Sequence, residues 1–65
     1  MKWVVSGKLR YEENKWVSKT YETKEEAEKV FEAIYNKPNA KFRLYVILEV
    51  DDKDNRRTLQ TLKLG

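Results

Sequence analysis

The sequence predicts an α+β fold of the order ββαββ, with a four-stranded, mainly antiparallel sheet and one helix packed on one face. Residues 23–36 carry apolar side chains at the spacing of a helical stripe. The segments on both sides of it alternate instead with the period of two that is typical of strands. Polar stretches, "EENK" and "DDKDN", divide each strand region into two, which predicts a β-hairpin on either side of the helix.

The first predicted hairpin joins residues 2–11, "KWVVSGKLRY", to residues 16–22, "WVSKTYE". A turn at residues 13–14 would place Lys8 opposite Lys19, which is unfavourable unless an anion or a partner lies between them. The side chains that we expect to face the helix are mostly small or aromatic: Trp3, Gly7, Leu9, Tyr11, Trp16, Ser18 and Thr20.

The helix has the strongest local signal in the chain. Thr23 is followed three residues later by Glu26, which is the pattern of a capping box. Pro38 prevents continuation of the helix beyond its last turn. The apolar stripe that should pack on the sheet consists of Ala27, Val30, Phe31 and Ile34.

The second predicted hairpin joins residues 41–50, "KFRLYVILEV", to residues 56–64, "RRTLQTLKL". Its connection, "DDKDN", lacks the glycine and the distal glutamate of an EF-hand loop, so we interpret it as a polar turn. In a strand over residues 41–50, alternate side chains would point to opposite faces of the sheet. We expect the helix-covered one to carry Phe42, Leu44, Val46, Leu48 and Val50.

A single helix covers only one face of a sheet, so the other face meets solvent or a partner. The expected open face mixes basic, aromatic and aliphatic side chains, and its apolar members cluster instead of scattering. The candidate binding residues are Val4, Lys8, Arg10, Val17, Lys19, Tyr21, Arg43, Tyr45 and Ile47.

Composition argues against several classes of function. The chain has 65 residues, which we interpret as one small domain spanning residues 1–65. It has no cysteine and no histidine, so we expect no disulfide, no metal site and no cofactor, and serine and threonine have no histidine to activate them. We therefore expect a non-enzymatic protein without a small-molecule substrate.

The apolar runs of the sequence are short. They fall far below the roughly 18 residues of a membrane span, and the first residues, "MKWVVSGKLR", lack the apolar stretch of a signal peptide. We expect no membrane association and a cytoplasmic, reducing location.

Three functions remain open. The first is binding of a protein partner, or of a second copy of the chain, through an apolar centre with a charged rim. The second is single-stranded nucleic-acid binding, because the strand regions are basic, with net charges of +3 for residues 1–21 and +2 for 38–65, whereas 22–37 carries −2. The third is an idealised designed scaffold without function, which the capping box and the 38% of charged residues fit.

One segment resembles a known family. Residues 15–34, "KWVSKTYETKEEAEKVFEAI", resemble the last strand and the helix of the arm-type DNA-binding domain at the start of phage integrases. The resemblance covers about a third of the chain. That family has three strands before its helix, where two are predicted here, and we assign no DNA-contacting residue from it.

Overall fold

The computed structural model describes residues 1–12 and 15–64, and its elements follow the predicted order ββαββ. The turn predicted at residues 13–14 lies outside the described residues. The elements are β1 (Lys2–Leu9), β2 (Trp16–Tyr21), α1 (Lys24–Asn36), β3 (Phe42–Val50) and β4 (Arg56–Lys63).

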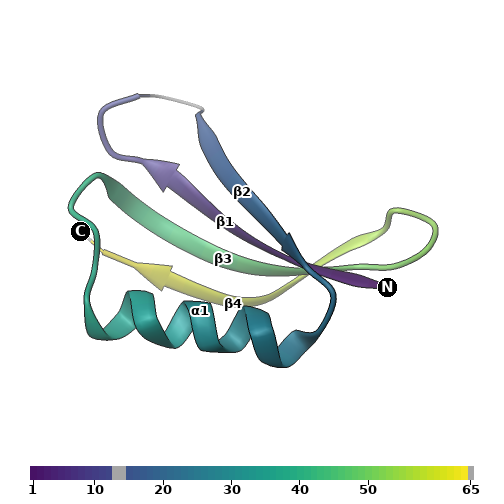
Figure 1. Ribbon diagram of the computed structural model, residues 1–65. Coiled ribbons are helices and arrows are strands. Elements are labelled where there is room, and N and C mark those ends of the chain that lie inside the picture. Colours follow the sequence, from purple (N-terminus) through teal and green to yellow (C-terminus); the bar gives the residue numbers. More distant parts are fainter. Residues whose placement is uncertain (13–14, 65) are drawn as a thin grey trace.

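The strands form one open antiparallel sheet in the order β2-β1-β3-β4, with α1 packed on one face (Figure 1). The helix connection carries the chain from the edge strand β2 past β1, so that β3 pairs with β1 on its other side. The predicted fold class is therefore confirmed. The central strands are β1 and β3, and the edge strands are β2 and β4.

Helix α1 begins as the capping box predicts. The Thr23 side-chain oxygen accepts a hydrogen bond from the Glu26 backbone N–H at 3.2 Å, which satisfies one of the free donors of the first turn. Ala27 and Phe31 are its buried residues. Within the described part of the chain, no helix is long and apolar enough to cross a bilayer.

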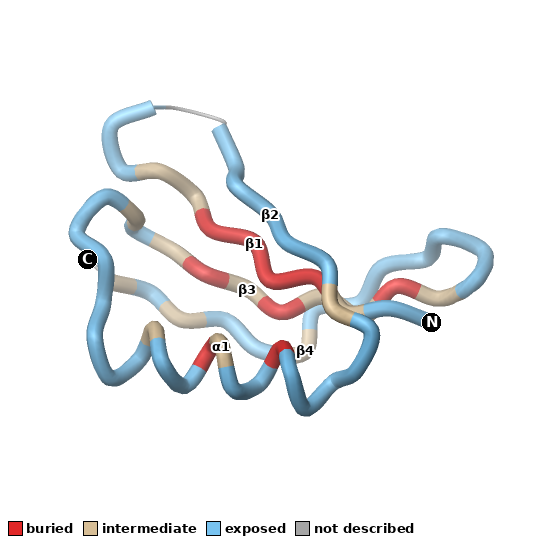
Figure 2. Tube along the Cα trace, viewed as in Figure 1, coloured by how far each residue is buried: buried red, intermediate tan, exposed pale blue. Residues whose placement is uncertain are grey.

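The core lies between α1 and the middle of the two central strands, where Figure 2 shows the buried segments in red. Gly7 leaves room there for two aromatic side chains of β3. The rings of Phe42 and Tyr45 lie 5.0 Å apart, and a Cβ atom at position 7 would come within 2.8 Å of both. The buried cluster consists of Val5, Ala27, Phe31, Tyr45 and Ile47.

Two irregularities shift the strand registers. Leu9 pairs with Phe42 but Lys8 pairs with Leu44, so Arg43 is an extra residue in β3. This bulge brings Phe42 to the helix side, where it packs against the core. In β4, Leu59 is the extra residue between the partners of Leu48 and Ile47, and it also packs against the core.

The connection of β3 and β4 is the polar turn predicted for "DDKDN". The Asp51 carboxylate accepts hydrogen bonds from the backbone N–H groups of Lys53 and Asn55, each at 2.9 Å, and Asp54 takes a positive φ of 65°. These bonds, above all those from Asn55, hold the pKa of Asp51 below its ordinary value because they favour the charged carboxylate. The acidic residues of this segment thus close a turn.

The face assignment was correct for β1 but wrong for β2 and β3. Trp3 and Gly7 face the helix as predicted, but Trp16 pairs with Lys8 and therefore lies on the opposite face. The predicted pairing of Lys8 with Lys19 is wrong, because Lys19 pairs with Val5. The residues wrongly assigned to the covered face are Trp16, Ser18, Thr20, Leu44, Val46, Leu48 and Val50, and Tyr11 is 87% exposed beyond β1.

Candidate functional site

The structure separates the nine predicted binding residues. Val4 and Lys8 lie on the face opposite α1, as predicted. Tyr45 and Ile47 do not, because they are only 7% and 1% exposed in the core beneath α1. Burial also raises the pKa of the Tyr45 phenol above its ordinary value. The prediction that this pair forms the centre of an open binding face is therefore wrong.

The remaining predicted residues lie at the margins of the sheet or on its helix side. Tyr21 packs against the core, and the Lys19 ammonium group lies 5.6 Å from the centre of its ring. Val17 shares this side because it pairs with Gly7. Arg43 is the bulged residue of β3. Arg10 follows β1, where its guanidinium group donates to the backbone carbonyl oxygens of residues 40 and 64, each at 3.3 Å.

The open face is the side of the sheet away from α1, and the strand pairing orders its side chains in rows across β2, β1, β3 and β4. The first row is Trp16, Lys8, Leu44 and Lys63; the second is Ser18, Ser6, Val46 and Thr61. The third row is Thr20, Val4, Leu48 and Thr58; the last, without β2, is Lys2, Val50 and Arg56. Aliphatic side chains thus occupy β3 and, through Val4, the middle of β1, whereas the other positions of β1 and the edge strands carry polar or aromatic side chains.

A groove of about 470 Å³ runs over this open face. Trp16 forms its wall on β2, and Arg56 and Thr58 form its wall on β4. Its floor contains Val46 and Leu48, which are half-buried, together with the hydroxyl groups of Ser6 and Ser18, 2.7 Å apart. The two edge strands therefore border a floor that is apolar on β3 and carries hydroxyl groups on β1 and β2.

The charges of the open face all have one sign. Its four charged residues within the described chain are basic: Lys2, Lys8, Arg56 and Lys63. The acidic side chains of α1 lie on the other side of the sheet. The Lys8 ammonium group lies 6.0 Å from the centre of the Trp16 ring, so a cation and the exposed aromatic wall stand together at one end of the groove. The strands therefore give this face a basic character, and the Asp54 carboxylate of the adjoining turn lies 4.0 Å from one of its cations, Arg56.

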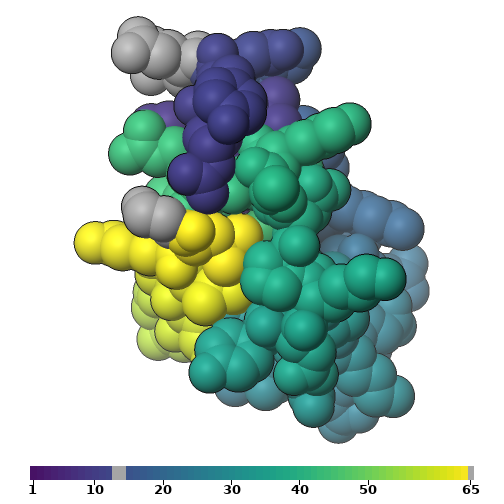
Figure 3. All heavy atoms as spheres, turned by 90° about the vertical axis from the view of Figure 1, so that its left-hand side faces the viewer, coloured from purple at the N-terminus to yellow at the C-terminus, as the bar shows by residue number. Residues whose placement is uncertain are grey.

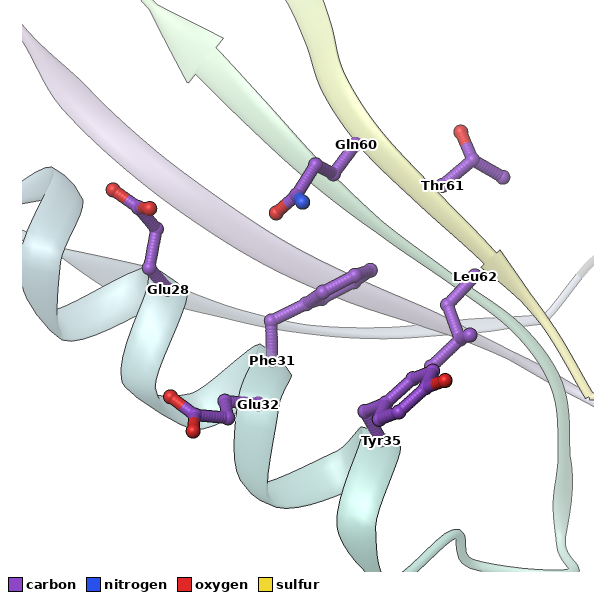
Figure 4. A pocket seen from close by; sticks show the side chains of 7 residues that line it. All are labelled: Glu28, Phe31, Glu32, Tyr35, Gln60, Thr61 and Leu62. Carbon is purple, nitrogen blue, oxygen red and sulfur yellow. The ribbon is translucent and has the colours of Figure 1, made fainter.

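A second hollow, of about 400 Å³, lies on the helix side between α1 and β4 (Figure 4). Gln60 and Leu62 point toward the helix, whereas Thr61 points away from it, as expected for alternating residues of a strand. Phe31 and Leu62 form its apolar part, and Glu28 and Glu32 border it. Figure 3 shows α1 (teal) beside β4 (yellow), the two elements that line this hollow.

Comparison of this chain with protein-family models, with curated proteins and with solved structures found no match. The resemblance of residues 15–34 to the integrase domain therefore receives no support from a wider match.

Sequence reasoning missed the residues that form the groove. Trp16, Val46 and Leu48 were assigned to the helix side, and Arg56 and Thr58 were not considered. One signal was available: residues 44–48, "LYVIL", are apolar without interruption, which is typical of a strand covered on both faces. Such a run indicates that both faces of the strand are apolar, whichever face the helix covers.

Proposed function

We propose that this chain is a non-enzymatic binding module that presents its open face to a protein partner. The supporting observation is the uninterrupted apolar run of β3. Tyr45 and Ile47 supply the helix side of this strand. Leu44, Val46 and Leu48 make the other side apolar as well, although α1 covers only the first side. An antiparallel strand with one solvated face alternates apolar with polar residues, and β3 departs from that pattern.

The layout of the open face supports the same proposal. Protein interfaces combine an apolar, poorly charged centre with a polar rim. Here Val46 and Leu48 lie on the central strand β3, and hydroxyl-bearing and basic residues lie along the edge strands. Trp16 is 44% exposed at the border of the groove and supplies the kind of aromatic anchor that interfaces favour.

A selection from a displayed peptide library tests the proposal. The double variant Val46→Thr, Leu48→Thr keeps strand-compatible side chains but removes the apolar floor of the groove. Val17→Thr is the matched control, because it replaces an exposed valine on the helix side of the same sheet. We expect peptides selected on the parent to lose binding to the double variant and to retain binding to Val17→Thr.

Two outcomes of this selection would contradict the proposal. Peptides that bind the parent and the double variant alike would show that the groove is not the binding site. Failure to select any peptide, with circular dichroism showing a folded parent, would favour an inert scaffold and contradict the proposal.

Single-stranded nucleic acid is the second candidate, because the charged residues described on the open face are all basic and Trp16 lies beside Lys8. It ranks below a protein partner because stacking platforms present several aromatic rings, and Trp16 is the one aromatic residue placed on this face by the described strands. Titration with a short oligodeoxythymidine at several salt concentrations tests it. Binding that Lys8→Gln with Arg56→Gln weakens, with a flatter salt dependence, would favour this candidate.

A further inference from the structure

The shape and the charge of the open face select one kind of protein segment. We infer that its occupant is an acidic amphipathic α-helix, laid along the groove with its apolar stripe on Val46 and Leu48 and its acidic flanks toward the basic rim. This inference rests on the proposed function and names the class of partner.

The width of the sheet suits a helix. The edge strands β2 and β4 are separated by three strand spacings, which amounts to about 14 Å across the open face. A helix with its side chains is roughly 10–12 Å across, so it fits within this width, between the strand β2 that carries Trp16 and the strand β4 that carries Arg56 in a different row. The groove between these walls has an apolar floor, which an amphipathic stripe would cover.

Backbone hydrogen bonding also favours a helix over an extended peptide. A strand lying on the face of a sheet, and not at its edge, finds no partners for its backbone N–H and C=O groups, and burying them is costly. A helix satisfies these groups internally. The opposite face of the same sheet already carries such an element, since α1 packs an apolar stripe on the core and exposes Glu25, Glu26, Glu28 and Glu32.

The basic residues of the open face favour an acidic helix as its partner and argue against a second copy of the chain. The cations on the open face lie toward both edges of the sheet: Lys8 lies beside Trp16 of β2, and Lys63 and Arg56 lie on β4, where Arg56 is also 4.0 Å from the Asp54 carboxylate. Acidic residues on both flanks of a helix would meet them. Two open faces packed against each other would bring like charges together, which is unfavourable.

Fluorescence of Trp16 provides a local probe of the groove. Trp3 would contribute a second signal, but its indole Nε1 is buried without a hydrogen-bond partner among the described residues, so Trp3→Phe loses no hydrogen bond. In this background we titrate a tryptophan-free peptide of about 18 residues with leucines at helical spacing and glutamates on both flanks. A second peptide carries lysine in place of glutamate. A third peptide has the same composition as the first, but its apolar and acidic residues alternate along the sequence, which is the pattern of a strand.

We expect the glutamate helix to shift Trp16 emission to the blue and to bind at least about tenfold more tightly than the lysine helix or the alternating peptide. Val46→Thr with Leu48→Thr should abolish the shift. Lys8→Gln with Arg56→Gln should weaken binding by about threefold to tenfold and reduce its salt dependence. The control pair Lys24→Gln with Lys29→Gln lies on α1, on the other side of the sheet, and should leave binding unchanged.

Different failures have different meanings. Equal or tighter groove-dependent binding of the lysine helix or of the alternating peptide overturns the acidic helix but leaves a protein-binding open face. Binding of oligodeoxythymidine alone, or the absence of any groove-dependent binding, overturns both the inference and the proposed function. Groove-dependent self-association in sedimentation overturns the inference in favour of a second copy.

Discussion

Two neighbouring residues of β3 should lose very different amounts of stability when threonine replaces them, because their side chains lie on opposite faces of the sheet. Ile47 is 1% exposed beneath α1, whereas Val46 is half-buried on the open face. Threonine at either position preserves a β-branched side chain and therefore the preference for a strand. The comparison of Ile47→Thr with Val46→Thr isolates the effect of the face.

The expected loss for Ile47→Thr follows from two steps. Removing one methylene, as in Ile47→Val, costs about 0.5–1.5 kcal/mol in a core. Replacing the remaining methyl group by a hydroxyl group without a partner costs about 1–3 kcal/mol more. We therefore expect a total of about 1.5–4.5 kcal/mol, which is a large share of the stability of so small a domain.

Val46→Thr also replaces a methyl group by a hydroxyl group but removes no methylene, and water can reach the new hydroxyl group on the open face. We expect the free energy of unfolding to change by less than about 1 kcal/mol. Urea denaturation followed by circular dichroism measures both variants, with Ile47→Val as the intermediate control and the m-value checking that unfolding stays two-state. A loss for Val46→Thr equal to or greater than that for Ile47→Thr would refute the assignment of the two faces.

Three further predictions concern the core and the helix. Phe31→Ala should cost about 3–5 kcal/mol and leave little folded protein, while Thr23→Ala should cost about 1 kcal/mol through the lost cap; thermal melts rank the two, and the reverse order would contradict the packing of α1. Gly7→Ala should cost about 1–3 kcal/mol, because the new Cβ atom would lie 2.8 Å from the rings of Phe42 and Tyr45; unchanged stability in urea would show that these rings yield freely. The raised pKa of Tyr45 means that the folded state holds the phenolic proton more tightly than the unfolded state, so stability present below pH 10.0 should fall as the pH rises through the folded pKa. Tyr45→Phe should remove this alkaline loss, and an identical pH profile for both proteins would refute it.

The local elements were predictable because their signals lie within a few residues of each other. The Thr23 side chain caps the helix by accepting a hydrogen bond from the Glu26 backbone N–H, three residues further along the chain. Asp51 likewise closes its turn through Lys53 and Asn55, its near neighbours in sequence. The order ββαββ followed from these local signals, and the single helix required one sheet face to remain without a helix.

The identity of the two faces could not be predicted in the same way. Residues 44–48 are apolar at every position, so alternation does not distinguish the side of Tyr45 from the side of Val46. The choice depends on pairing with β1 and on the room that Gly7 leaves for aromatic rings of β3. A shift of one residue in β2 likewise exchanges Trp16 for Val17 on the open face.

The sequence by itself determined the helix, its cap, the polar turn after β3 and the succession ββαββ along the chain, because each depends on neighbouring residues. Only the tertiary structure decided which side chains meet on the open face. Strand registers are set by contacts between distant segments, and the bulges at Arg43 and Leu59 alter them locally. Since side chains alternate with a period of two, a difference of one residue moves a whole strand's contribution to the other face, and with it the candidate site.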